Sequence, residues 1–501
     1  AERGRLYAPG TRTRARLTRR AVVLAAGGAA LAGAVGVFAW RSGRLGGDPA
    51  ASTSNKVAVL PFKNLSGDTS QDYFSDGLSE ELRSTLARNL KLQVMAQTSS
   101  AKFRDHTEDA VTIASRLGVG YLLDGTVRRS GEIARITADL IDGHTGFSRW
   151  SQSFDRSLHD IFAVQSEIAR TVASALTAEM VPDPKVPAGS AGTLAAEGGT
   201  RSAQAFDAYL QGRALYDLSA DEASERAALA QFDLAIAADP DYAPAHAARA
   251  RSLTAIANQY GKAGQLQELY ESAIESARRA IEIAPGLADA YSTLGFTLFQ
   301  GKLDARGARE PFERSRELGA GEATVLARYA QYSARVGRSQ DAAAAIQRAL
   351  LLDKLNPLIH RAAGAIEYAA RDYRASIPPT RQALQMNPQM SRAHAAIGDA
   401  LFMLGRHDEA RTEYLAEPAS DFGLTGLAVV EHRLGNEQSA RDAFAKIDEE
   451  GARLRYQQAQ VLAQWGQLDA AITRLQQARV IGDSGLVYAR NDPLLDPLRG
   501  D

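Results

Sequence analysis

The chain has 501 residues, which is too long for one hydrophobic core, and we therefore expect two or more domains. Its formal net charge of -1 argues against binding of nucleic acid along the whole length. It contains no cysteine, which excludes disulfides, thiolate zinc sites and cysteine nucleophiles.

The first forty residues combine a basic arm with an apolar segment. Residues 1–20 carry seven arginines and one acidic residue, whereas residues 21–40 carry no charge. Such an uncharged segment is about long enough to cross a bilayer as a helix, and the arginines before it favour a cytoplasmic N-terminus. The pattern predicts a cytoplasmic arm at 1–20, a transmembrane helix at 21–40 in a bacterial inner membrane, and a periplasmic or extracytoplasmic position for 41–501.

A cleaved export signal is the alternative interpretation of this segment. Thr18–Leu24 and the apolar stretch after it are similar to a twin-arginine signal. However, Trp40 follows soon after Phe38, so a small-x-small cleavage site is missing there. Both alternatives export the rest of the chain. The Gly-, Pro- and Ser-rich residues 41–55 predict a linker.

Residues 56–181 alternate between strand and helix patterns. Short β-branched runs predict strands, and apolar residues at four-residue spacing predict helices. Turn residues between the last three strands predict an antiparallel meander. The sequence thus predicts a small α/β domain at 56–181. Its expected strands are 56–62, 92–97, 119–128, 134–142 and 147–154, and its expected helices are 71–89, 109–117 and 160–180.

Six phrases of this domain resemble, in order, the TolB-like N-terminal domain: VAVLPFKNLSGD, YFSDGLSEELRSTLAR, TSSAKF, LGVGYLLDGTVRRSG, ITADLIDGHTG and IFAVQSEIA. In such relatives the domain commonly lies between a transmembrane helix and tetratricopeptide repeats. An adenylate cyclase domain or a winged-helix DNA-binding domain often precedes that helix. The resemblance implies a fold and a context, and it supplies no catalytic residue.

A unit of about 34 residues recurs after a flexible linker at 182–203. In its clearest copy, Ser391–Tyr414, an apolar helical face is followed by a turn at Gly405 and a second amphipathic segment. The phrases YSTLGFTL and HAAIGDAL, with helix-ending prolines, resemble the tetratricopeptide repeat (TPR) family. We predict an array of about eight repeats at 204–482 and a C-terminal tail at 483–501.

The TPR resemblance implies a groove lined by the first helix of each repeat, which would bind a protein or peptide. Half of the side chains selected in this way fit the core between repeats equally well, two of the phenylalanines especially. The oligomeric state is left open. The candidate groove residues are Asp289, Phe296, Phe299, Gln300, Arg392, Asp399, Phe402 and Met403.

Known catalytic and cofactor patterns are missing from the sequence. The eight histidines show no H-E-x-x-H spacing, and neither a P-loop nor a G-x-G-x-x-G occurs. Ser99–Lys102 fits S-x-x-K but lacks its companion motifs. We assign Asp76, Glu80 and Glu81 to the first turn of a helix, where backbone amides favour acidic side chains. No catalytic residue, metal or cofactor is predicted.

Together these observations predict a multidomain protein with one N-terminal transmembrane helix, a small α/β domain and an all-α TPR solenoid. The leading hypothesis is a non-enzymatic, membrane-tethered interaction scaffold that binds a protein or peptide and no nucleic acid. The alternative is the sensory half of a signalling protein whose cyclase or DNA-binding domain lies outside this chain. A periplasmic hydrolase is disfavoured, because the sequence indicates no nucleophile and base that would converge.

Overall fold

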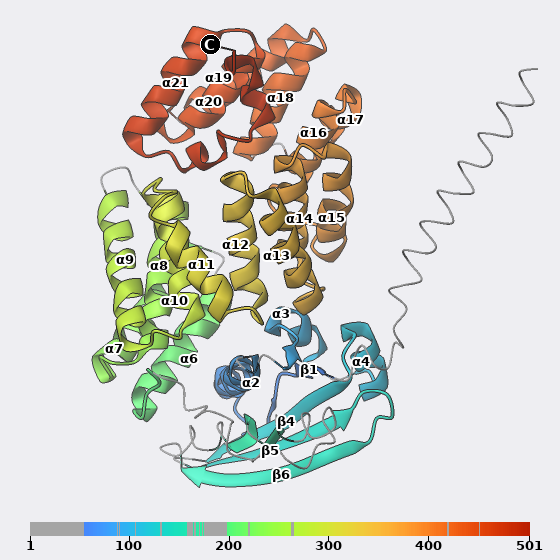
Figure 1. The fold of residues 1–501 in the computed structure, drawn as a ribbon, viewed down its shortest axis with the longest axis vertical. Coiled ribbons are helices and arrows are strands. Elements are labelled where there is room, and N and C mark those ends of the chain that lie inside the picture. The colour runs from blue at the N-terminus through green and yellow to red at the C-terminus, as the bar shows by residue number, and fades with distance from the viewer. Residues whose placement is uncertain are drawn as a thin grey trace, which may run out of the picture. The chain divides into compact units, whose positions relative to one another are not determined.

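A computed structural model describes most of the chain after residue 54 (Figure 1). Residues 54–501 form one compact unit. The described residues are 55–87, 89, 91–105, 107–130, 133–157, 164, 167–169, 171–172, 174, 198–218, 221–261, 265–417, 420–449 and 451–500.

A mixed sheet forms the first part of the described chain. Its strand order is β3-β1-β4-β5-β6, and the short β2 pairs with β4 off this path. β1 is parallel to β3 and to β4, whereas β4, β5 and β6 are antiparallel neighbours (Figure 1), which confirms the predicted meander. The strands are β1 Lys56–Val59, β2 Lys63–Asn64, β3 Gln93–Val94, β4 Tyr121–Ser130, β5 Ile133–Asp142 and β6 Ser148–Ser157.

The two faces of β1 are covered by different helices. Val57 and Val59 belong to a buried cluster with the leucines of α2 (Asp72–Ala87), and Ala58 belongs to a cluster with α4 (Ala110–Leu117). Successive side chains of a strand point to opposite faces, so an uninterrupted apolar strand is buried on both sides. The predicted helices at 71–89 and 109–117 are therefore confirmed.

Two short helices between β3 and α4 were not predicted. They are α3 (Gln97–Ser100) and the 3₁₀ turn η2 (Ala101–Phe103). The predicted helix at 160–180 lies largely outside the described residues. Its described members Val164 and Ile168 are buried in the same cluster as α2.

The rest of the chain is a TPR-like array of antiparallel helix pairs, coloured from green to red in Figure 1. Within the described residues there are eight such hairpins, α6–α7 to α20–α21. Their helices are α6 Ala203–Leu218, α7 Glu222–Ala238, α8 Ala243–Tyr260, α9 Leu266–Ile283, α10 Ala288–Phe296, α11 Arg309–Leu318, α12 Ala323–Arg335, α13 Ser339–Leu352, α14 Pro357–Ala369, α15 Tyr373–Met386, α16 Ala393–Met403, α17 His407–Leu415, α18 Asp421–Arg433, α19 Glu437–Glu449, α20 Arg455–Gln464 and α21 Leu468–Ile481.

Glycine allows the two helices of a hairpin to approach each other. A Cβ atom on Gly398 of α16 would lie 2.6 Å from the Tyr414 ring of α17, and one on Gly295 of α10 would lie 2.9 Å from the Phe312 ring of α11. Both distances are too short for a methyl group. The aromatic ring of the second helix therefore packs directly against the backbone of the first.

The turns of the last five hairpins share one hydrogen-bond pattern. In the α16–α17 turn, the amide of Gly405 donates to the carbonyl of Phe402, and the next amide donates to Leu401. This pattern needs a left-handed residue at the turn, which is usually glycine. Arg371 occupies that position in the α14–α15 turn with a φ of 66°. The corresponding residues of the other four turns are Gly337, Gly405, Gly435 and Gly466.

The predicted fold class is wrong in one element. Among the described residues, no helix is both long and apolar enough to span a bilayer. The helix that was predicted to do so, at 21–40, lies outside the described residues, as do most of the linkers at 41–55 and 182–203. The fold is therefore a predominantly helical TPR-like solenoid with a small sheet region, and the predicted inner-membrane location stays a prediction.

Candidate interaction site

The candidate groove residues on the third hairpin come together around two arginines. The Asp289 carboxylate of α10 lies 3.4 Å from Arg251 of α8 and 3.7 Å from Arg328 of α12. The Arg328 guanidinium also lies over the Phe296 ring, 5.4 Å from its centre. Three neighbouring first helices thus share one polar strip.

The other two candidates of this hairpin lie close by. Phe299 is buried, and its ring meets Tyr332 of α12 edge-on at 5.2 Å, so it belongs to the core between hairpins. Gln300 is half-buried in the π-helical turn η4 (Thr297–Gly301). The sequence had left open which of the candidate phenylalanines belong to this core.

The candidates on the sixth hairpin form a second group. The exposed Arg392 guanidinium lies 3.9 Å from the centre of the Phe422 ring. Phe402 is buried, and the half-buried Met403 packs against the same hydrophobic cluster. Asp399 accepts a 2.8 Å hydrogen bond from the Tyr414 hydroxyl. Burial, followed by the charges of neighbouring carboxylates, raises the pKa of Asp399 to about 7.

The C-terminal tail approaches this second group. In the tail, defined as residues 484–498, two 3₁₀ turns, η6 (Ser484–Tyr488) and η7 (Pro493–Leu498), follow α21. Leu494 of η7 is buried in the same hydrophobic cluster as Phe402 of α16, and the charge of Asp492 contributes to the raised pKa of Asp399. The sequence predicted a C-terminal tail at 483–501, but it did not indicate that the tail reaches the first helices.

Side chains of α20 bind the middle of the tail. The Tyr456 hydroxyl and the Gln460 amide each donate a 2.6 Å hydrogen bond to Asp492 Oδ2. The Gln464 amide donates a 2.8 Å bond to the carbonyl of Leu494. Residues four positions apart lie on one face of a helix, so α20 presents a single polar face to the tail.

The fourth and fifth hairpins bind the two ends of the tail. The Arg335 guanidinium of α12 lies 4.2 Å from the centre of the Tyr488 ring, and the Asn491 amide donates a 2.7 Å bond to the carbonyl of Ala334. Arg371, in the left-handed turn before α15, forms two hydrogen bonds of 2.5 and 2.6 Å with Asp496. These contacts were not predicted from the sequence. An arginine at 371, where the other turns have glycine, was the available signal.

A buried charge cluster joins α2 to the start of the array. Arg83 donates two hydrogen bonds of 2.6 and 2.8 Å to Glu80, and Arg213 of α6 lies 3.2 Å from Glu81. Burial alone would raise the pKa of Glu80, but the positive charge of Arg83 keeps it below its usual value. The first-turn interpretation is therefore corrected. α2 begins at Asp72, and Asp76 is paired with Arg104 instead.

The S-x-x-K motif has a structural role. The Ser99 hydroxyl is fully buried and donates a 2.6 Å hydrogen bond to Asp353, in the loop between α13 and α14. The same oxygen accepts a bond from the amide of Leu355. Because both bonds tie α3 to the array, this hydroxyl is not presented to a substrate.

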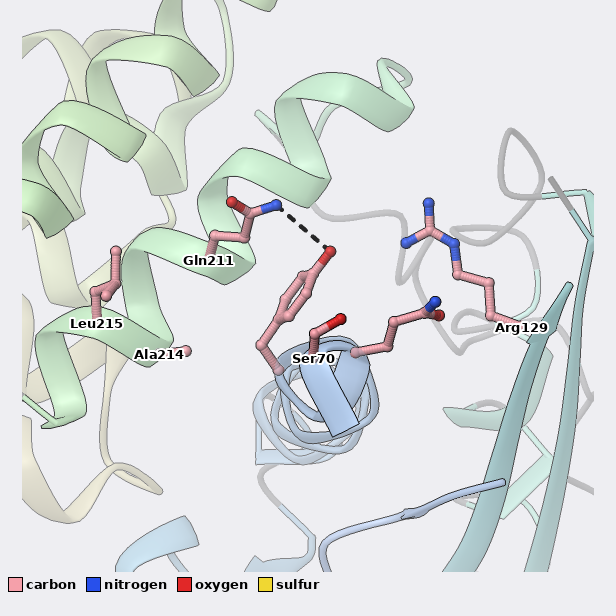
Figure 2. Close-up of a pocket in the computed structure, with 7 residues that line it drawn as sticks. Ser70, Arg129, Gln211, Ala214 and Leu215 are labelled. Atoms are coloured by element: carbon pink, nitrogen blue, oxygen red, sulfur yellow. Dashed lines mark hydrogen bonds between the residues drawn. The ribbon is translucent and has the colours of Figure 1, made fainter. Parts of the chain in front are cut away.

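A pocket of about 680 Å³ lies where α6 meets η1 (Thr69–Gln71) and β4. Figure 2 shows Ser70, Gln211 and Arg129 projecting toward it from these three elements. The Tyr73 hydroxyl donates a 2.7 Å bond to Asp207, and Gln211 donates a bond to that hydroxyl. The polar groups at this junction therefore bind one another. Within the described residues, no group of side chains is suited to hold a metal ion.

The geometry defines a TPR-like interaction fold behind a small sheet domain. Residues 52–171 match the family model described as the HilA/YgeH-like transcriptional regulator, second domain. The TolB-like assignment stays a prediction. A protein named putative adenylate cyclase 3 from Rhizobium meliloti is 34% identical over 251 residues. That match covers 50% of this chain and 41% of the relative, so the chain spans less than half of that protein.

Two solved structures of low sequence identity are similar to parts of this chain. The thermophilic TPR protein TTC0263 of Thermus thermophilus is 19% identical, with a TM-score of 0.33, and the match covers 40% of this chain and 99% of that one. The human IFIT1 dimer, solved with m7Gppp-AAAA, is 14% identical with a TM-score of 0.41, and the match covers 65% and 82%.

Proposed function

We propose that this chain is a non-catalytic interaction scaffold whose first helices bind a protein or peptide. One observation carries the proposal: the first helices already bind a segment of this chain, residues 488–496, which is not α-helical. Tyr456, Gln460 and Gln464 of α20 bind its middle, and the fourth and fifth hairpins bind its ends. A surface that binds carboxylates and backbone carbonyls of one segment has the chemistry to bind another.

The repeat architecture supports the same function. In a solenoid each hairpin contacts mainly its neighbours, so the first helices line a continuous surface along the array. On the third hairpin this surface carries Asp289 between two arginines, and on the sixth it carries Arg392 and Asp399. Charged side chains of both signs on such a surface favour a polar peptide or protein over a small apolar ligand.

Charge reversal tests the scaffold. The full-length chain, immobilised through an affinity tag, is used to capture proteins from a bacterial envelope extract. We expect the variant Arg392→Glu with Asp399→Arg to lose captured protein while its helical circular dichroism is unchanged. The matched control is Arg226→Glu on the second helix α7, where the side chain is 51% exposed. Equal capture by both variants would exclude the sixth hairpin as the binding surface.

A second candidate function is the sensory half of a signalling protein. The observation that favours it is the 34% identity to a putative adenylate cyclase of which this chain spans 41%, together with the match of residues 52–171 to a domain of transcriptional regulators. In this hypothesis the scaffold controls a catalytic or DNA-binding domain encoded upstream. Sequencing the coding region before Ala1 is the test, and a start codon directly before Ala1 would contradict the hypothesis.

A further inference from the structure

The tail offers the first helices a defined set of chemical groups. Its sequence from 491 is Asn-Asp-Pro-Leu-Leu-Asp-Pro-Leu. Asp492 and Asp496 are bound through their carboxylates, and Leu494 and Leu495 between them are buried to 3% and 4% exposure. The site therefore accommodates two acidic side chains four residues apart, with two leucines between them.

The array supplies donors that match these acids. Tyr456 and Gln460 converge on Asp492, and the planar guanidinium of Arg371 forms a bidentate pair with Asp496. Bidentate arginine–carboxylate pairs are specific in orientation as well as in charge. The tail acids thus meet donors from two hairpins, the fifth and the eighth.

Arg371 occupies a turn position that favours glycine, but its side chain is well suited to bind a carboxylate. Its φ of 66° is a left-handed conformation, which a side chain other than glycine adopts at a cost of roughly 1 kcal/mol. Four equivalent turns use glycine and avoid that cost. Arg371 also donates a 3.4 Å bond to the Tyr373 hydroxyl of its own hairpin, but its two shorter bonds go to Asp496, so the tail is its main partner.

Two buried polar groups of α14 near the tail form no hydrogen bond with it. The Tyr368 hydroxyl and Arg361 Nε of α14 are inaccessible to solvent and have no hydrogen-bond partner among the described residues. Tyr368 lies next to the tail site, because its ring is 5.4 Å from that of Tyr373, whose hydroxyl accepts a bond from Arg371. Arg361 lies two turns earlier on the same helix. A ligand with additional acceptors would satisfy these donors better than the tail does.

We propose that the tail is an intramolecular substitute for the partner, and that the surface formed by α12, α14, α16 and α20 binds an acidic, leucine-containing peptide of another protein. This inference rests on the proposed scaffold function and specifies its ligand. The partner segment carries two acids that flank leucines, and it binds when the tail leaves. A tail in cis is present at a high effective concentration, so it lowers the apparent affinity of any partner.

Competition with a synthetic peptide tests this proposal. The probe is a fluorescent peptide of residues 488–501, and fluorescence anisotropy measures its binding to the full-length chain. In the variant Asp496→Lys the chain's own tail loses its bond to Arg371, while the surface remains intact. We expect the variant to bind the probe at least about tenfold more tightly than the unaltered chain does, because cis competition is weakened.

Two controls establish where the probe binds. A scrambled peptide of the same composition should not bind. Adding Arg371→Gly to Asp496→Lys should abolish the gain, although glycine suits the turn and leaves the hairpin folded. Helical circular dichroism of each variant confirms folding. A folded Asp496→Lys chain that does not bind the probe, or binding that survives Arg371→Gly, would overturn the proposal.

The same variants separate the other outcomes. If Asp496→Lys forms a dimer in sedimentation experiments, tails are exchanged between two copies, and the proposed partner peptide is contradicted. If the Arg392→Glu and Asp399→Arg variant loses a captured protein but the tail peptide does not bind, the scaffold function stands and the tail inference fails. If captured protein competes with the probe, both are supported.

Discussion

The junction between α2 and the array and the tail site both bury carboxylates, but they neutralise them differently. At the junction Glu80 contacts Arg83 at 2.6 Å, and this pairing keeps the pKa of Glu80 below its usual value even though burial opposes ionisation. At the tail site Asp399 and Asp492 accept hydrogen bonds from hydroxyl and amide groups, and burial raises the pKa of both. The junction pairs its buried carboxylate with a buried opposite charge. At the tail site these two buried carboxylates are only solvated, and the charge pair Arg371–Asp496 is partly exposed.

Because of this difference, we expect the junction to be a permanent contact and the tail site to be a releasable one. Each buried charge of the junction has an opposite charge beside it, so removing either partner leaves an ion without compensation. Asp492 loses less when it returns to water, because water replaces hydroxyl and amide donors well. The Arg371–Asp496 pair is 44% and 34% exposed, and such pairs contribute little to stability. We therefore expect the junction to stay closed under conditions in which the tail opens.

The largest predicted effect comes from breaking the junction. Glu80→Ala leaves the Arg83 guanidinium, in a residue only 9% exposed, without its carboxylate. We expect a loss of about 3 to 5 kcal/mol in the free energy of unfolding, as for other broken buried pairs. Urea unfolding followed by circular dichroism measures it.

The exposed pair Glu222–Arg226 provides the matched control. Its side chains are 45% and 51% exposed, and Glu222→Ala should change the free energy of unfolding by less than about 0.5 kcal/mol. If Glu80→Ala and Glu222→Ala destabilise the chain equally, charge pairing does not hold the junction, and the contrast between the two sites disappears.

The second prediction concerns pH at the tail site. The pKa of Asp399 is about 7 in the folded chain and near 3.8 in the unfolded chain, so the folded state retains a proton between these values. Its contribution to stability is therefore full below about pH 4 and decreases as the pH rises to about 7. Asp399→Asn removes this decrease and keeps an acceptor for Tyr414.

At pH 8 we expect Asp399→Asn to be more stable than the unaltered chain by about 2 kcal/mol, after allowance for the partial exposure of this residue. At pH 4 the two should be equal. Thermal unfolding at both pH values measures the difference. The junction should show the opposite sign, because the pKa of Glu80 is lowered and its contribution is lost only as the pH falls through the acidic range. A pH-independent Asp399→Asn difference would contradict the contrast.

Local patterns predicted the hairpins because their contacts are local. Gly398 and Tyr414 are sixteen positions apart, and the turn at Gly405 lies between them, so one window of sequence contains the whole unit. The strands of the meander are predictable for the same reason, since each pairs with its neighbour in sequence. Periodicity and turn residues were sufficient for both.

Contacts between distant segments could not be predicted in this way. Arg371 and Asp496 are 125 positions apart, and Arg213 and Glu81 are 132 positions apart. Neither pair produces a periodic pattern in the sequence from which the contact could be predicted. Among the candidate residues, the position of Asp399 near the tail could not be predicted, and its role in a binding groove stays a prediction. The TPR resemblance indicates which helices line the surface, but only the three-dimensional structure shows that the tail occupies it.

The smallest predicted effect on stability concerns the turn that binds the tail. Arg371→Gly relieves left-handed strain of about 1 kcal/mol and removes an ion pair whose side chains are 44% and 34% exposed, worth roughly 0 to 1 kcal/mol. The free energy of unfolding should therefore change by less than about 0.5 kcal/mol. Amide hydrogen exchange in 491–498 should nevertheless become faster, because the tail loses an anchor.

The reverse substitution completes this test. Gly466→Arg places an arginine in an equivalent left-handed turn with a φ of 75°, where a Cβ atom has nothing within 4 Å and Asp496 is already bound elsewhere. It should destabilise the chain by about 1 kcal/mol without changing exchange in the tail. If Arg371→Gly were as destabilising as Gly466→Arg, the arginine would serve the turn itself. Faster tail exchange at nearly constant stability would instead identify Arg371 as a ligand of the tail, and the tail site as the releasable one of the two.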